Sequence, residues 1–163
     1  MKNISFSILI VFASSFYTMG QDWSQWRGVE RQGIWHEDGI IDQFPDDGLK
    51  VTWRVPIGSG YAGPAVANGR VFVLDWTEEA SSRTLDGTER LLVLDEETGG
   101  ELWTAEWQTS YRALMGSYAI GPRATPTVEG DSVFVVGATG RLLSFDVTDG
   151  SRNWSVDYVE DYD

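Results

Sequence analysis

The glycine-rich stretch from Gly58 to Gly63 has the spacing Gly-x-Gly-x-x-Gly that cradles phosphate groups in nucleotide-binding proteins. That chemistry requires a helix directly after the glycines, because the amino terminus of the helix helps to bind the anion. Here Pro64 follows, and then Asn68-Gly69, a pair that is typical of a tight β-hairpin turn. We therefore interpret residues 58–63 as a loop that leads into a β unit, and not as a phosphate site.

A second stretch places acidic side chains at the spacing of a calcium-binding loop. Asp95, Glu97, Gly100 and Glu106 match positions of a loop that joins two helices. The flanking residues, however, have the pattern of strands, and a second copy of the stretch that begins at Asp146 lacks the closing glutamate. A turn explains both copies, so we favour a turn over a metal site.

Histidine and cysteine are the side chains that most often carry metal or nucleophilic chemistry, and both are scarce. The sequence has one histidine, His36, and no cysteine. A site with two histidines is impossible within one chain, and the lack of cysteine excludes disulfides, thiolate zinc sites and cysteine catalysis. We interpret His36 as a surface or docking residue, and we predict no catalytic, cofactor-binding or metal-binding residue.

Two tyrosines and two arginines lie in a long connection between the two repeats that are described below, and long loops commonly carry binding sites. These candidate residues for a ligand or partner loop are Tyr111, Arg112, Tyr118 and Arg123. The alternative for the two arginines is pairing with the abundant carboxylates.

The charge balance restricts the partners. The chain has 12 Lys and Arg residues against 25 Asp and Glu residues, a formal net charge of -13. Binding of nucleic acid or of anionic lipid needs clustered basic residues that neutralise phosphates, and the basic residues here are scattered. We therefore expect no nucleic-acid partner.

The first 20 residues have the pattern of a secretory signal. Lys2 precedes an apolar run from Ile4 to Ala13, and Thr18 and Gly20 are small residues placed for cleavage before Gln21. The alternative is a membrane anchor, but the run is shorter than the ~20 residues that span a bilayer. We predict export to the periplasm or the extracellular space, with no membrane span after cleavage.

Residues 21–50 form a predicted arm, rich in Trp and Gly, and an internal repeat follows it. Residues 95–103 and 146–154 both have the form Asp-x-x-(Thr or Asp)-Gly-x-x-x-Trp, 51 residues apart. The matches continue upstream through apolar runs separated by turn signals, which predicts two copies of four antiparallel strands. We divide this part into repeat 1 (51–107) and repeat 2 (108–163).

Each residue type that recurs in the two copies has a structural explanation. Asp95 and Asp146 can accept hydrogen bonds from backbone amides of the next turn, and Gly99 and Gly150 can take its left-handed position. One tryptophan per repeat then falls on the fourth strand, where its side chain can pack between neighbouring sheets. The three predicted docking residues are Trp53, Trp103 and Trp154.

The Asp-x-x-x-Gly-x-x-x-Trp pattern resembles the tryptophan-docking repeat of quinoprotein alcohol dehydrogenases and of the wider pyrroloquinoline-quinone-like β-propeller family. The resemblance covers residues 51–158, and the arm from Asp22 to Gly28 is similar to the start of secreted members. It implies that Trp103 and Trp154 pack against adjacent blades. Trp53 departs from the pattern, since Pro45 stands where the Asp is expected and Gly48 is one residue out of place.

The resemblance implies an all-β propeller of four-stranded antiparallel blades, and this chain holds about two blades and a leading strand. Because a propeller needs about four to eight blades, we expect an incomplete propeller whose second repeat is truncated. The expected partners are further blades, other copies of this chain or an exported protein. We predict an exported, non-catalytic binding or scaffold module without a cofactor. The alternative is a fragment of a quinone-dependent alcohol or sugar dehydrogenase, which would use pyrroloquinoline quinone with calcium.

Overall fold

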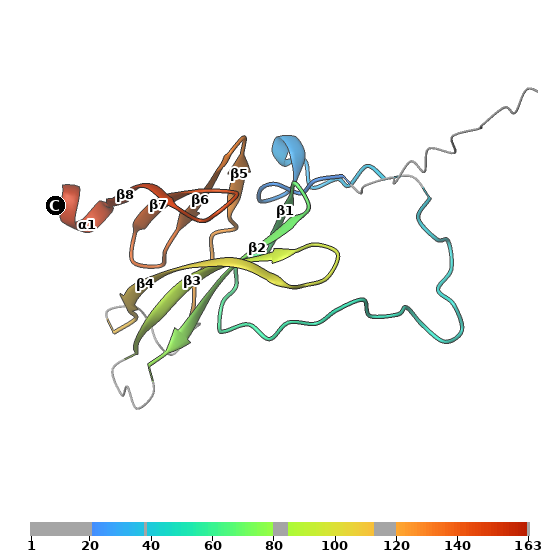
Figure 1. The fold of residues 1–163 in the computed structure, drawn as a ribbon, viewed down its shortest axis with the longest axis horizontal. Coiled ribbons are helices and arrows are strands. Elements are labelled where there is room, and N and C mark those ends of the chain that lie inside the picture. Colours follow the sequence, from blue (N-terminus) through green and yellow to red (C-terminus); the bar gives the residue numbers. More distant parts are fainter. Residues whose placement is uncertain (1–20, 38, 80–84, 113–119, 163) are drawn as a thin grey trace, which may run out of the picture.

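The computed structural model describes residues 21–37, 39–79, 85–112 and 120–162, so the predicted signal and Tyr118 lie outside the described residues. Within this part of the chain, two four-stranded antiparallel sheets follow each other, each with its strands in chain order (Figure 1). The strands are β1 (Ala65–Ala67), β2 (Arg70–Glu78), β3 (Asp86–Asp95), β4 (Glu101–Ser110), β5 (Thr127–Glu129), β6 (Ser132–Val136), β7 (Arg141–Asp146) and β8 (Arg152–Asp157). The sheets stay open and do not close into a ring, which confirms the predicted fold class of an incomplete propeller.

The first two strands of each sheet are joined by a tight turn. Asn68 and Gly69, between β1 and β2, both have positive φ angles, 54° and 71°. Two-residue hairpins favour this conformation because it matches the twist of the strands. In the second sheet Gly130, with φ 58°, stands in the corresponding turn between β5 and β6.

The turn between the third and fourth strands also recurs. The Asp95 carboxylate accepts hydrogen bonds from the Thr98 amide at 2.8 Å and the Thr98 hydroxyl at 2.7 Å, and the hydroxyl is the main cause of the lowered pKa of Asp95. Asp146 accepts from the amide of Thr148 at 2.7 Å. These contacts explain why an acidic residue begins each turn.

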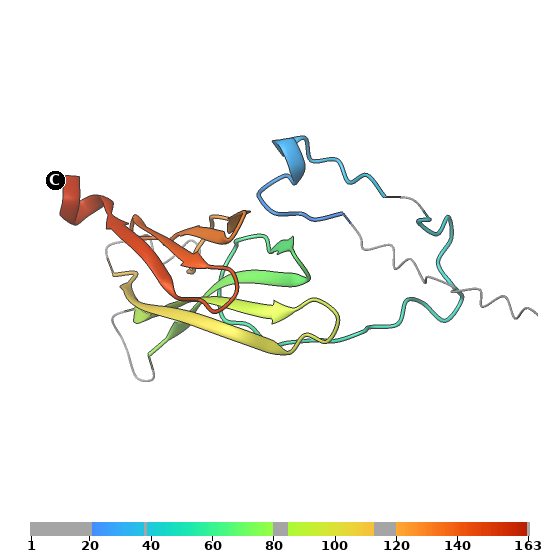
Figure 2. The same ribbon diagram turned by 45° about the horizontal axis from the view of Figure 1, so that its top comes forward.

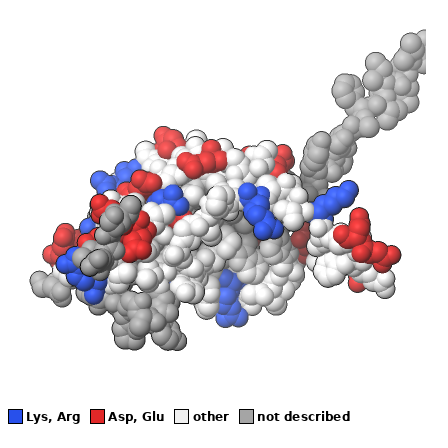
Figure 3. Space-filling view, turned by 90° about the horizontal axis from the view of Figure 1, so that it is seen from below, with Lys and Arg blue, Asp and Glu red and all other residues white. Residues whose placement is uncertain are grey.

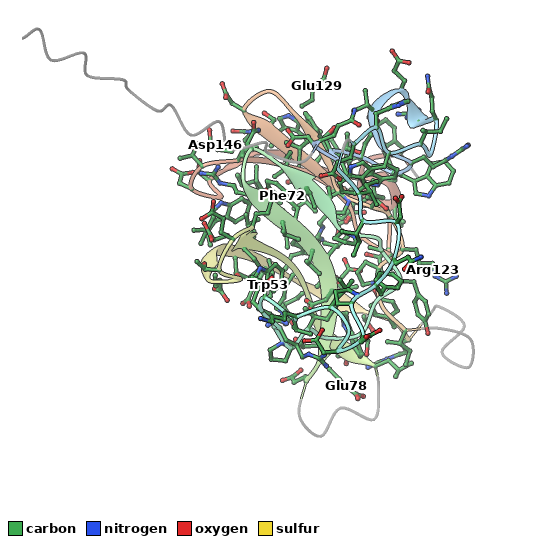
Figure 4. All side chains as sticks on the ribbon, turned by 90° about the vertical axis from the view of Figure 1, so that its right-hand side faces the viewer. Trp53, Phe72, Glu78, Arg123, Glu129 and Asp146 are labelled. Atoms are coloured by element: carbon green, nitrogen blue, oxygen red, sulfur yellow. The ribbon has the colours of Figure 1, made fainter. Side chains whose placement is uncertain are left out.

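The hydrophobic core lies between the two sheets. The first sheet contributes Phe72, Leu74, Leu91 and Val93 from one face, and the second contributes Val133, Val135, Leu143 and Phe145. Figure 4 shows Phe72 in the middle of these side chains, whereas Arg123 and Glu129 lie at the periphery. Each sheet buries this face only because the other covers it.

The arm is fastened to the edges where the sheets approach each other, at β1 and β5. Trp23 exchanges backbone hydrogen bonds with Val66 of β1, at 2.7 and 3.0 Å, and the carbonyl of Ser24 accepts from Val128 of β5 at 2.8 Å. The Trp23 ring also stacks on Trp35, with centroids 5.5 Å apart. One short segment therefore ties the inner strands of both sheets together.

Between these contacts and residue 51 the arm runs out from the sheets and returns, as the cyan and teal segment of Figures 1 and 2 shows. It includes a short 3-10 turn, η1 (Val29–Arg31). Its large apolar side chains are more than half exposed at Ile40, Ile41, Phe44 and Leu49. The described arm thus presents apolar surface that the two sheets leave uncovered.

Strand β8 leads into one short helix, α1 (Tyr158–Tyr162), which the sequence pattern did not predict. The Asp157 carboxylate accepts hydrogen bonds from the amides of Val159 and Glu160 at 3.1 and 3.3 Å, the contact that caps the start of a helix. No helix in the described residues has the length and apolar character to cross a bilayer.

Candidate functional site

Trp103 of β4 makes a direct contact between the two sheets. Its Nε1 donates a hydrogen bond to the carbonyl of Val147 at 3.0 Å. Its ring lies against Gly150, where a Cβ atom would come within 2.5 Å of the indole. Gly150 has φ 73°, which glycine adopts without steric cost. The turn of the second sheet therefore offers the indole both a hydrogen-bond acceptor and a flat surface.

Trp53 makes the same pair of contacts on the other side of the first sheet. Its Nε1 donates to the carbonyl of Glu96 at 2.9 Å, and a Cβ at Gly99 would lie 2.7 Å from its ring. Figure 4 shows Trp53 on the segment that precedes β1. In both contacts the acceptor carbonyl follows the turn aspartate by one residue and the glycine follows it by four. Although Pro45 and Gly48 depart from the repeat pattern, Trp53 makes the same two contacts as Trp103.

The Gly150→Ala variant is expected to lose about 2–4 kcal/mol of unfolding free energy, because its methyl group would meet the Trp103 ring as well as strain the backbone. Gly69→Ala is the matched control. Gly69 has nearly the same φ, 71°, but nothing lies within 4 Å of the added Cβ, so only the backbone cost of about 1–2 kcal/mol remains. Urea unfolding of both variants measures the difference, and equal losses would contradict the contact.

Trp154 of β8 occupies the position that Trp103 occupies in β4, but its surroundings differ. Its side chain is 43% exposed. Its ring lies 6.0 Å from that of Phe134 on the same sheet. Among the described residues no glycine turn covers this indole in the way that Gly99 and Gly150 cover the other two.

A buried carboxylate forms a second link between the sheets. Glu89 of β3 is fully buried. It accepts hydrogen bonds from Trp107 Nε1 and from the Tyr111 hydroxyl, both at 2.7 Å, and from the backbone amide of Ala138 in the second sheet at 2.9 Å. Gly137 makes the approach possible, since a Cβ there would collide with the carboxylate. Glu89 therefore ties β3 to the β6–β7 loop.

Glu89 was not predicted from the sequence as a functional residue, although a signal for it was present. Glu89 lies two residues before Leu91 and four before Val93, and alternate residues of a strand share a face. This alternation places Glu89 on the inward face, opposite Trp107. The indole of Trp107 can donate a hydrogen bond to the carboxylate. The repeat concealed it, because the equivalent position in the second copy is Gly140.

Asp75 of β2 is a second deeply buried acidic side chain in the described part of the chain, and it positions the loop before β1. It is 1% exposed and pairs with Arg90 through two hydrogen bonds, of 2.9 and 2.7 Å. The hydrogen bond to Asp75 is the main cause of the raised pKa of Arg90. The Gly58 amide also donates to Asp75. Residues 58–63 are accordingly held as a loop beside β2, where Ser59 forms a bridge with Trp76.

The described candidate residues of the long connection contact different partners. Tyr111 is 2% exposed, and burial, followed by its hydrogen bond to Glu89, raises its pKa. Arg112 forms an exposed ion pair with Asp86 at 3.0 Å. The Arg123 guanidinium lies 5.9 Å from the centre of the Tyr61 ring. The role of these three residues in a ligand or partner loop stays a prediction, and Tyr118 lies outside the described residues.

A groove of about 480 Å³ opens where the arm crosses the hairpin ends of the sheets. Asp22, Asn68, Arg70 and Asp131 are among the residues that line it. Nη1 of Arg70 donates to the Asn68 carbonyl at 2.9 Å. The groove brings opposite charges together, and on the face seen in Figure 3 basic side chains likewise lie among acidic ones. This surface does not select a ligand of one charge.

Among the described residues, no group of acidic side chains is arranged to hold a calcium ion. Calcium takes six to eight oxygen ligands, usually with several carboxylates. The structure groups no three His, Cys, Asp or Glu side chains around a point that could hold a metal ion, in the ranges that it describes. The two buried carboxylates, Glu89 and Asp75, already accept hydrogen bonds from indole, hydroxyl, amide and guanidinium donors. This arrangement can hold two sheets together and present aromatic surface.

Comparison with known proteins relates the chain to one family. The model of the family described as outer membrane protein assembly factor BamB matches residues 37–162. Among solved structures, a europium-containing methanol dehydrogenase is 21% identical with a TM-score of 0.45, over 68% of this chain and 19% of that chain. BamB from Moraxella catarrhalis is 17% identical with a TM-score of 0.34, over 61% and 33%. The match thus spans about a fifth and a third of those two proteins. No curated protein matches the sequence.

Proposed function

The chain belongs to the pyrroloquinoline-quinone-like β-propeller repeat family, and from this premise we propose that it is an exported, non-catalytic binding or scaffold module. Its two blades form part of a larger propeller, in the periplasm or the extracellular space. The apolar run from Ile4 to Ala13 supports export. The matched family is described as an outer membrane protein assembly factor, so the proposed partner is another exported protein.

The observation that carries this proposal is the set of hydrogen bonds made by the two buried carboxylates, Glu89 and Asp75. Glu89 and Asp75 are enclosed by donors from this chain, which leaves them as structural acceptors and not as bases for a substrate. The exposed large apolar side chains include Trp154 and several residues of the arm. Exposed apolar patches of this kind mark surfaces that bind other proteins.

In the same proposal, Trp53 and Trp103 hold consecutive blades by docking on the turns at 95–99 and 146–150. Trp154 has the same role toward a further blade. Two similar hydrogen bonds support a single docking mode. The Trp53 indole donates to the Glu96 carbonyl at 2.9 Å, and the Trp103 indole donates to the Val147 carbonyl at 3.0 Å.

A reconstitution assay tests the non-catalytic role. The chain from Gln21 onward is incubated with calcium, pyrroloquinoline quinone and a dye acceptor, and alcohols or aldose sugars are then added. We expect dye reduction at the rate of the buffer. Unfolded protein and a sample without calcium serve as controls, and a cooperative melting curve shows that the tested protein is folded. Protein-dependent reduction of the dye would instead favour the fragment of a quinone-dependent dehydrogenase.

A further inference from the structure

The groove of about 480 Å³ at the hairpin ends of the sheets is built by segments that lie far apart in the sequence. Its charged lining residues are Asp22 of the arm, Arg70 at the start of β2 and Asp131 in the turn between β5 and β6. Figure 4 shows Glu129, which precedes that turn, at the end of the molecule opposite Glu78. The tertiary structure thus brings two carboxylates and one guanidinium to the same opening.

Arg70 has hydrogen-bonding capacity that the described part of the chain does not use. A guanidinium carries five N–H donors. Nη1 donates to the Asn68 carbonyl at 2.9 Å, whereas the buried Nε has no partner among the described residues. The charge of Arg70 contributes to the lowered pKa of Asp95, but in the same residues these two side chains form no ion pair. Arg70 therefore lines the groove as a cation with donors to spare.

The two carboxylates of the groove are also available to a ligand. Asp22 Oδ2 accepts one long hydrogen bond, of 3.4 Å, from the Asn68 amide. Asp131 is exposed, and its backbone carbonyl, not its carboxylate, accepts from the Val147 amide at 3.0 Å. Within the ranges that the structure describes, neither carboxylate forms an ion pair. The groove therefore offers charges of both signs that do not neutralise each other by direct contact.

The distance between these opposite charges is limited, because both side chains contact the backbone of Asn68. The Asp22 carboxylate accepts from its amide and the Arg70 guanidinium donates to its carbonyl. The amide nitrogen and the carbonyl oxygen of one residue are about 3 Å apart, so the two charged ends lie within about 10 Å of each other. In an α-amino acid the ammonium and the carboxylate are also about 3 Å apart, and a hydrogen bond of about 2.9 Å at each end extends this span to about 9 Å. One such molecule can therefore bridge the two side chains.

We infer that this groove binds a small zwitterion of the α-amino acid class, with its carboxylate on Arg70 and its ammonium on Asp22 and Asp131. An anion would meet two carboxylates and a cation would meet a guanidinium, whereas a zwitterion places each charge opposite its counterpart. Hydrogen bonds between such charged groups are stronger than those between neutral groups. The groove is separate from the tryptophan contacts at Gly99 and Gly150, so this inference goes beyond the proposed function.

Isothermal titration calorimetry of the purified chain with L-alanine tests the inference. The methyl group of this probe can lie on the apolar lining residues Ala67, Val128 and Val147, which are at most 7% exposed. Acetate and methylammonium each carry one of the two charges of the probe and serve as matched ligands. We expect L-alanine to bind at least about tenfold more tightly than either of them, because only the zwitterion contacts both signs of charge.

Two variants each remove one charge from the groove. Arg70→Gln and Asp131→Asn should both weaken L-alanine binding at least about tenfold. Arg152→Gln, which changes an exposed arginine that does not line the groove, is the control and should leave binding unchanged. Circular dichroism shows whether each variant is folded, and the exposed position of Asp131 keeps the test valid if Arg70→Gln does not fold.

Three results would overturn the inference. The first is a folded chain that shows no saturable binding of L-alanine. The second is acetate or methylammonium that binds as tightly as L-alanine, since the groove would then select a single charge. The third is unchanged binding of L-alanine by the Asp131→Asn chain. None of these results depends on quinone turnover, so this inference and the proposed function can fail separately.

Discussion

Replacing Trp103 by alanine is expected to lower the free energy of unfolding by about 3–5 kcal/mol. The substitution removes an indole that lies between the sheets, 6.5 Å from the Phe145 ring, and that donates to the Val147 carbonyl at 3.0 Å. The cavity cannot collapse easily, because Gly150 and Phe145 belong to a second sheet with its own strand pairing. Urea unfolding followed by circular dichroism measures the change.

Trp154→Ala is the matched control for that prediction. It removes the same side chain from the equivalent position of the other repeat, but this indole is 43% exposed. The expected loss is about 1 kcal/mol or less, since a surface substitution leaves little cavity. Equal losses in the two variants would show that Trp103 does not connect the sheets.

Replacing Glu89 by alanine is expected to cost about 3–5 kcal/mol, although it removes a charge from the core. The reason is the set of donors that surrounds the carboxylate. Trp107 Nε1, the Tyr111 hydroxyl and the Ala138 amide would all lose their acceptor in a buried space. Each buried donor left without a partner costs about 1–3 kcal/mol. Thermal and urea unfolding measure the loss.

Glu89→Gln distinguishes loss of the acceptors from loss of packing, because glutamine has nearly the same shape. One of its two polar ends is a donor, which would face the existing donors. We expect an intermediate loss of about 2 kcal/mol. Glu129→Gln, on the exposed side of β5, should change stability by less than about 0.5 kcal/mol. A Glu89→Ala variant as stable as the Glu129 control would refute the role of this carboxylate.

The fold class followed from local patterns in the sequence. Turn residues such as Asn68-Gly69 and the two Asp-x-x-x-Gly motifs act within a few residues of themselves, so their spacing predicted where the strands begin and end. The recurrence of the whole unit then indicated repeated four-stranded blades. The structure confirms these sheets with their strands in chain order. The roles of Trp53, Trp103 and Trp154 as docking residues stay a prediction, which the variants above test for Trp103 and Trp154.

Local sequence patterns did not predict which side chains contact each other when they come from distant segments of the chain. Tyr111 was predicted to belong to a binding loop, and the structure buries its hydroxyl against Glu89, 22 residues away. The bonds of Trp23 to β1 and of Ser24 to β5 likewise join residues more than 40 positions apart.

The sequence by itself therefore determined the strands, the turns and their repetition, because short-range geometry and alternation of apolar residues specify them. Only the tertiary structure decided which face of the second sheet stays open, that the indoles of this chain fill both of its glycine turns, and that a carboxylate lies in the core. The physical reason is that burial is a property of two surfaces together. A residue such as Trp154 carries the same local pattern as Trp103, and only the neighbouring sheet distinguishes them.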